Sequence, residues 1–89
     1  MDKGKRIILS GNVQGVGLRR YCEMIARDFN LKGYVRNQED GTVIIEAYGL
    51  ERSVTNLMSK LERRYEIENK EMEDIPPNHK IWSFQIIHK

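Results

Sequence analysis

The stretch RIILSGNVQGVGLRRYCEMIARDF, residues 6–29, changes its hydrophobic period at a pair of glycines, and this change decides the fold. Apolar and polar residues alternate from Arg6 to Val13, and this period of two predicts a strand. After Gly15 and Gly17, apolar residues recur every three or four positions, which predicts a helix ending near Asn30. A strand that leads through a glycine-rich turn into a helix is a common architecture for binding an anion with backbone N–H groups.

The middle of the chain predicts a hairpin and a second helix. A short strand, Tyr34–Arg36, is followed by the turn Glu39–Gly41 and a strand from Thr42 to Tyr48, so these two strands should be antiparallel neighbours. Apolar residues at helical spacing then predict a helix that has Ser53 as its N-cap and runs to about Arg64.

The last third of the chain is harder to interpret. The polar segment from Tyr65 to Asp74 is predicted to be a fourth strand at a sheet edge, with a helix extension as the alternative. A closing strand, Ile81–Ile87, follows the break at Pro76 and Pro77, and it should place Trp82, Phe84 and Ile86 on one face.

This order of elements is typical of a ferredoxin-like α+β sandwich, in which two helices cover one face of a mostly antiparallel sheet of four to five strands. The 89 residues suffice for one domain, predicted to span residues 1–89. A net charge of +2 is far from the excess of a dedicated nucleic-acid binder. One cysteine and two histidines are too few for an internal disulfide or a zinc site. The apolar run near the N-terminus is too short for a signal-peptide core or a membrane span, so we expect a mature, cytoplasmic chain.

The glycine turn does not match two familiar phosphate motifs. Leu18 and Arg19 stand where a Walker A loop needs Lys and Ser or Thr, and Arg20 stands where a dinucleotide fingerprint needs its third glycine. The N–H groups near Gly15 and Gly17 can still converge on one tetrahedral anion, with Arg19 gripping two of its oxygens. The alternative is a tight turn without a ligand, followed by a solvated arginine.

Asn37 is predicted to lie near this turn. In a ferredoxin-like order the first two strands run in the same direction and end at the same edge of the sheet. Two strand spacings separate them by ~10 Å, which Arg19, Asn37 and a phosphate between them can fill. An amide there can position a water molecule, although Asn37 is also a typical residue to start a turn.

Three segments together resemble the acylphosphatase family: Gly11–Arg19, Gly33–Asn37 and Asp40–Val43. The resemblance implies metal-free and cofactor-free hydrolysis of the carboxyl–phosphate bond of a small acyl phosphate. It implies that Arg19 grips the substrate and Asn37 orients the attacking water. The phosphate-binding loop implied by the resemblance consists of Gln14, Gly15, Val16, Gly17 and Leu18. The family usually has Phe in place of Leu18 and often Trp in place of Tyr34, and residues 65–80 show little likeness to it.

The carboxylate that leaves an acyl phosphate is a stable anion at neutral pH, so no strong general acid is required. The other reactive side chains are interpreted as structural or solvated: Cys22 as a buried thiol, and His79 and His88 as solvated side chains. We expect a monomer with no metal, nucleic-acid or membrane partner. Three alternatives remain: an inactive anion-binding regulatory module of the same fold, a nucleic-acid-binding ferredoxin-like domain, and the related domain of larger carbamoyl-transfer proteins.

Overall fold

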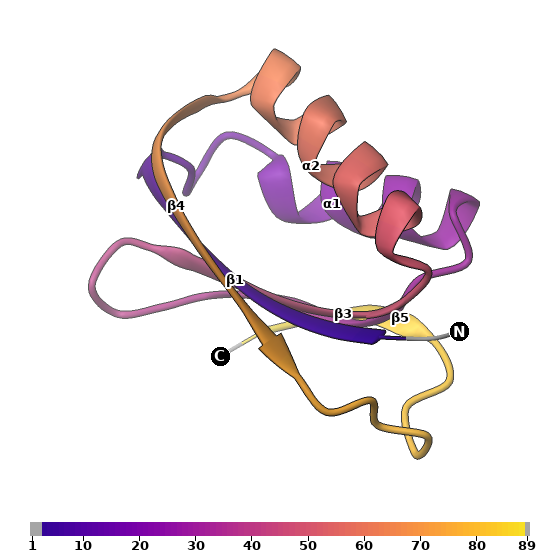
Figure 1. Ribbon diagram of the computed structural model, residues 1–89. Helices are drawn as coiled ribbons and strands as arrows, with labels where there is room; N and C mark the ends of the chain where they lie inside the picture. The colour runs from indigo at the N-terminus through magenta and orange to yellow at the C-terminus, as the bar shows by residue number, and fades with distance from the viewer. Residues whose placement is uncertain (1–2, 89) are drawn as a thin grey trace.

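Two helices lie side by side over one face of a five-stranded sheet (Figure 1). The structure is a computed structural model and describes residues 3–88. Its elements are β1 (Lys3–Asn12), α1 (Leu18–Asp28), β2 (Lys32–Asn37), β3 (Val43–Gly49), α2 (Glu51–Arg64), β4 (Glu66–Ile75) and β5 (Phe84–Ile87).

The sheet order is β4-β1-β3-β2-β5, which confirms the predicted α+β ferredoxin-like fold. β3 is antiparallel to both β1 and β2, so β1 and β2 run in the same direction and end at one edge of the sheet. β4 pairs antiparallel with β1, and β5 pairs parallel with β2, so the sheet is mostly antiparallel. The loop after β1 and the last residue of β2 are thereby placed at the same edge.

The core lies between the sheet and the helices, because alternate strand residues and one stripe of each helix face each other. Each fully buried aliphatic side chain contributes about 1.5–3 kcal/mol. The buried stripe of α1 includes Leu18 and Cys22, and that of α2 includes Leu57 and Leu61. The strands contribute Ile7, Leu9, Val35, Val43, Ile45, Ala47 and Phe84.

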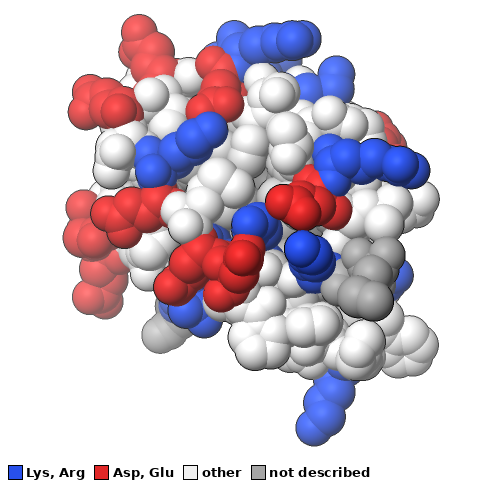
Figure 2. All heavy atoms as spheres, viewed as in Figure 1, with Lys and Arg blue, Asp and Glu red and all other residues white. Residues whose placement is uncertain are grey.

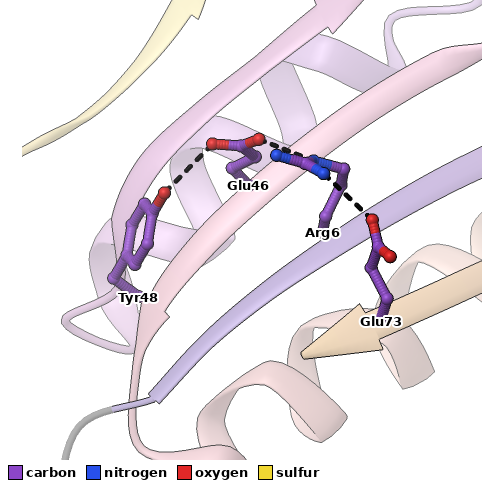
Figure 3. Close-up of polar contacts among 4 residues, drawn as sticks. All are labelled: Arg6, Glu46, Tyr48 and Glu73. Carbon is purple, nitrogen blue, oxygen red and sulfur yellow. Dashed lines mark hydrogen bonds and ion pairs between the residues drawn. The ribbon is translucent and has the colours of Figure 1, made fainter. Parts of the chain in front are cut away.

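A polar network on the opposite face of the sheet joins three strands (Figure 3). Arg6 of β1 donates from Nε to Glu46 of β3 at 2.8 Å and from Nη1 to Glu73 of β4 at 2.9 Å. The Tyr48 hydroxyl donates to the other oxygen of Glu46 at 3.0 Å. Burial, and then the Glu46 carboxylate, raise the pKa of Tyr48 to about 12. The network therefore ties the polar edge strand β4 to the centre of the sheet.

The C-terminal third confirms one interpretation and corrects another. β4 is a strand along nearly all of the predicted segment, so the helix extension is wrong. The closing strand contains only Phe84–Ile87, and Trp82 lies outside it with 85% of its surface exposed. The prediction that Trp82 shares a face with Phe84 and Ile86 was wrong, because an apolar alternation does not show where pairing with β2 begins.

The predicted cap of the second helix was also wrong. α2 begins at Glu51, two residues before Ser53, and Leu50 occupies the N-cap position without a side-chain hydrogen bond. The Ser53 N–H instead donates to the Leu50 carbonyl at 3.0 Å. Glu51 in the first turn interacts favourably with the helix dipole, so the helix starts without a capping side chain.

Candidate active site

The turn between β1 and α1 depends on glycine because of its backbone angles. Gly15 has φ 72° and Gly17 has φ 84°, both in the left-handed region that other L-residues rarely adopt. A Cβ at Gly15 would meet no atom within 4 Å, so the requirement is conformational and not steric. The two glycines let the chain turn within a few residues from the end of β1 into α1.

The first turn of α1 is uncapped. Gly17 occupies the N-cap position, no side chain caps the helix, and its first turn contains no acidic residue. The first N–H groups of a helix have no intrahelical acceptor, and this end of the helix carries partial positive charge. The start of α1 thus offers hydrogen-bond donors and a favourable field to an anion.

A pocket of about 220 Å³ opens beside this helix end. It brings together the turn after β1, the first residues of α1, the end of β2 and one residue of β5. The lining residues are Val13, Gly15, Gly17, Leu18, Arg19, Arg20, Asn37 and Ile86. The structure therefore places Arg19 and Asn37 at one pocket, as their positions in the sequence predicted.

Asn37 is the last residue of β2 and pairs with the buried Val43 of β3. Its Oδ1 atom is one of two buried side-chain polar atoms without a hydrogen-bond partner in residues 3–88. An unpaired buried acceptor is unfavourable in a folded protein and is common at functional sites. The amide oxygen of Asn37 is thus available to accept a hydrogen bond from a water molecule or ligand.

Gln14 and Leu18 belong to the predicted loop, but their side chains have other contacts. Gln14 Nε2 donates to the carbonyl oxygens of Gln38 and Thr42, both at 2.8 Å, and so ties the turn to the β2–β3 hairpin. Leu18 is 1% exposed and fills the core, so only its backbone can reach the pocket. The anchoring contact of Gln14 was missed by the sequence analysis, because its partners are 24 and 28 residues away.

Arg19 carries its guanidinium at the start of α1, where it lines the pocket. In residues 3–88 it has no ion pair within 4 Å, although several other basic side chains of the molecule do. Arg20, the next residue, lines the same pocket and was not singled out from the sequence. Its position next to Arg19 at the start of a helix was the available signal. Two arginines and an uncapped helix end give the pocket a positive character.

The thiol and the imidazoles of residues 3–88 are not among the groups that line this pocket. Burial raises the pKa of the Cys22 thiol far above its usual range, so Cys22 is an unreactive core residue. His79 and His88 are exposed. No group of three His, Cys, Asp or Glu side chains within residues 3–88 is arranged to hold a metal ion. None of the described helices has the length and apolar character needed to cross a membrane.

Fold and pocket together define a ferredoxin-like α+β sandwich with an arginine-lined pocket where β1 and β2 end. A model of the acylphosphatase family matches residues 5–86, and the chain belongs to that family.

Individual relatives agree with this assignment. An acylphosphatase of Bacillus licheniformis is 47% identical over 58 residues, which cover 65% of this chain and 64% of that protein. An acylphosphatase of Koribacter versatilis is 36% identical over 88 residues, covering 96% of this chain and 80% of that protein. The crystal structure of an acylphosphatase from Bacillus subtilis superposes with a TM-score of 0.88 at 29% identity, covering 98% of this chain and 99% of that one.

Proposed function

We propose that this protein is an acylphosphatase, which hydrolyses the carboxyl–phosphate bond of small acyl phosphates to a carboxylate and phosphate. The single observation that carries the proposal is the shared pocket of Arg19, Asn37 and the uncapped start of α1 in a chain of this family. The pocket supplies cationic and N–H donors for a phosphoryl group and an acceptor for water. These are the groups that phosphoryl transfer by positioning and charge stabilisation requires.

Arg19 and the backbone N–H groups from Gly15 onward hold the phosphoryl group in this proposal. A guanidinium donates two parallel N–H bonds to two phosphate oxygens and stays charged at any working pH. The helix end adds its partial positive charge. Both interactions strengthen as negative charge spreads over the equatorial oxygens in the transition state, so they lower the barrier as well as bind substrate.

Asn37 orients the nucleophile. Its unpaired Oδ1 accepts a hydrogen bond from a water molecule and directs the water oxygen at phosphorus, opposite the leaving carboxylate. The new P–O bond forms as the bond from phosphorus to the acyl oxygen breaks, and the carboxylate leaves with the electron pair. A proton of the water passes to a phosphate oxygen, so the products are a carboxylate and dihydrogen phosphate. This route needs no general acid from the protein.

Turnover of benzoyl phosphate and acetyl phosphate tests the proposal directly. We expect Arg19→Ala to raise KM and lower kcat together, with a loss in kcat/KM of about 10²–10³, as for removal of other transition-state donors. Asn37→Ala should mainly lower kcat, because the water is positioned only in the productive complex. Unchanged kcat in a folded Asn37→Ala variant would contradict the water-positioning role.

Arg52→Ala is the matched control. Arg52 is an exposed arginine in the first turn of α2. This helix follows β3, which runs antiparallel to β1 and therefore ends at the opposite end of the sheet from the pocket. Loss of one positive charge there should leave kcat/KM within about twofold, because exposed charges beyond a Debye length of ~8 Å are largely screened. Each assay is run with and without EDTA, and the proposal requires turnover that EDTA does not change.

The competing functions find less support than hydrolysis. On the face in view in Figure 2, basic and acidic side chains are interspersed, which favours a small anion over a nucleic acid as the ligand. A regulatory module would bind phosphate without turnover and is excluded if the benzoyl phosphate assay succeeds.

We further propose that the protein is a cytoplasmic monomer that uses no metal. Light scattering after size exclusion tests whether the protein is a monomer.

A further inference from the structure

Glu23 lies one helical turn after Arg19 on α1, and Arg27 lies one turn after Glu23. Residues four apart on a helix are neighbours on its surface, so the Glu23 carboxylate is within reach of either arginine. In the structure Glu23 pairs with Arg27, with 3.3 Å between Oε2 and Nη2. Arg19, which lines the pocket, has no ion pair in residues 3–88.

Two features explain why Glu23 pairs with Arg27. A glutamate that precedes a basic residue by four positions is in the more favourable order on a helix, whereas the pair Arg19 and Glu23 has the reverse order. The Arg27 side chain is also held in place, because its Nε donates to the Phe84 carbonyl of β5 at 2.9 Å. Arg27 is therefore fixed where it can hold the carboxylate.

A free Glu23 carboxylate would harm an anion site in two ways. It would either occupy the N–H groups of Arg19 that a phosphate needs or remain as an unneutralised negative charge one helical turn, ~6 Å, from Arg19. We propose that Arg27 is a positioning residue of the active site, which holds Glu23 and thereby keeps Arg19 free for phosphate. This inference rests on the proposed function of Arg19, and Arg27 itself does not line the pocket.

Orthophosphate binding by four proteins tests the inference: the wild type, Arg27→Gln, Glu23→Gln and the double variant. We expect Arg27→Gln to weaken phosphate binding roughly three- to tenfold, because Glu23 then turns to Arg19. The double variant should bind within about twofold of the wild type, because the competing carboxylate is gone. In turnover assays the Arg27→Gln defect should appear mainly in KM.

A purely structural role of Arg27 predicts a different pattern. If Arg27 only holds β5 through the Phe84 carbonyl, Glu23→Gln cannot restore that hydrogen bond, and the double variant should bind as weakly as Arg27→Gln. That result, or undiminished binding by Arg27→Gln, would overturn the inference. Thermal unfolding of each variant shows whether the fold is kept.

A ligand-free measurement separates this inference from the proposed function. The NMR signal of the Arg19 Nε–H group should move in Arg27→Gln and return toward its wild-type position in the double variant. If the wild type failed to bind phosphate while this signal moved as expected, the proposed function would fail and the competition for Glu23 would stand. A signal that is the same in all four proteins would overturn the competition.

Discussion

At the scale of single residues, Gly17 shows how one backbone angle supports the site. Gly17 has φ 84° where the turn ends and α1 begins. A Cβ at this position would meet only the Tyr65 hydroxyl, 3.9 Å away. Substitution therefore strains the backbone without causing a clash. The effect of a side chain at this position should come from φ alone.

We expect Gly17→Ala to lower the free energy of unfolding by about 1–2 kcal/mol, which is the cost of the left-handed region for an L-residue. If the turn relaxes to avoid the strain, the N–H groups rotate away from the pocket and KM for acetyl phosphate rises. Urea unfolding and steady-state kinetics measure the two effects. A variant with wild-type stability and wild-type KM would show that the positive φ is not needed.

At the scale of elements, the β2–β3 hairpin supports the loop beside it. Asp40 accepts hydrogen bonds from the Thr42 hydroxyl at 2.6 Å and the Thr42 N–H at 3.0 Å. Thr42 and Gln38 in turn offer the two carbonyls that hold Gln14. The turn of the hairpin is thus connected through Gln14 to the glycine loop.

The Asp40 carboxylate makes this hairpin sensitive to acid. Its hydrogen bonds from Thr42 hold the pKa of Asp40 below its ordinary value. A lowered pKa in the folded state means that the stabilisation is present above the unfolded pKa, about 3.9, and is lost as pH falls through the folded value. We expect Asp40→Asn to have a lower Tm than the wild type at pH 6, with the two Tm values converging between about pH 5 and pH 2. A constant difference over this range would show that the charge of Asp40 is not responsible.

At the scale of the whole molecule, phosphate should stabilise the fold, because the pocket exists only when β1, α1, β2 and β5 are assembled. A ligand that binds only the folded state adds RT ln(1 + [L]/Kd), about 1.4 kcal/mol at ten times Kd. For a domain of this size this corresponds to a rise in Tm of roughly 6–11 °C. Sodium chloride at equal ionic strength should give a much smaller rise, and Arg19→Ala should lose most of the phosphate effect. An equal rise in Tm with phosphate in the wild type and in Arg19→Ala would indicate a general salt effect and not binding at Arg19.

The sequence alone was sufficient to predict the order of the elements and to predict that Arg19 and Asn37 lie near each other. The periods of two and 3.6 in hydrophobicity reflect which residues face the core, so β1, α1 and α2 were recognised from their own residues. The right topology then followed, because in the ferredoxin-like order β1 and β2 run in the same direction and their last residues lie at the same end of the sheet. The predicted polar edge strand was confirmed as β4, although none of its residues is buried and hydrophobic period therefore did not identify it.

Only the tertiary structure decided the contacts that join distant segments. The binding of Gln14 to the hairpin carbonyls, the hydrogen bond from Arg27 to the Phe84 carbonyl and the exposure of Trp82 could not be predicted from residue order. Hydrophobic periodicity records burial, which is largely a local pattern along the chain. The partner of a polar side chain depends instead on which of several nearby groups the packed elements bring within hydrogen-bond distance, and that choice is made only when the chain has folded.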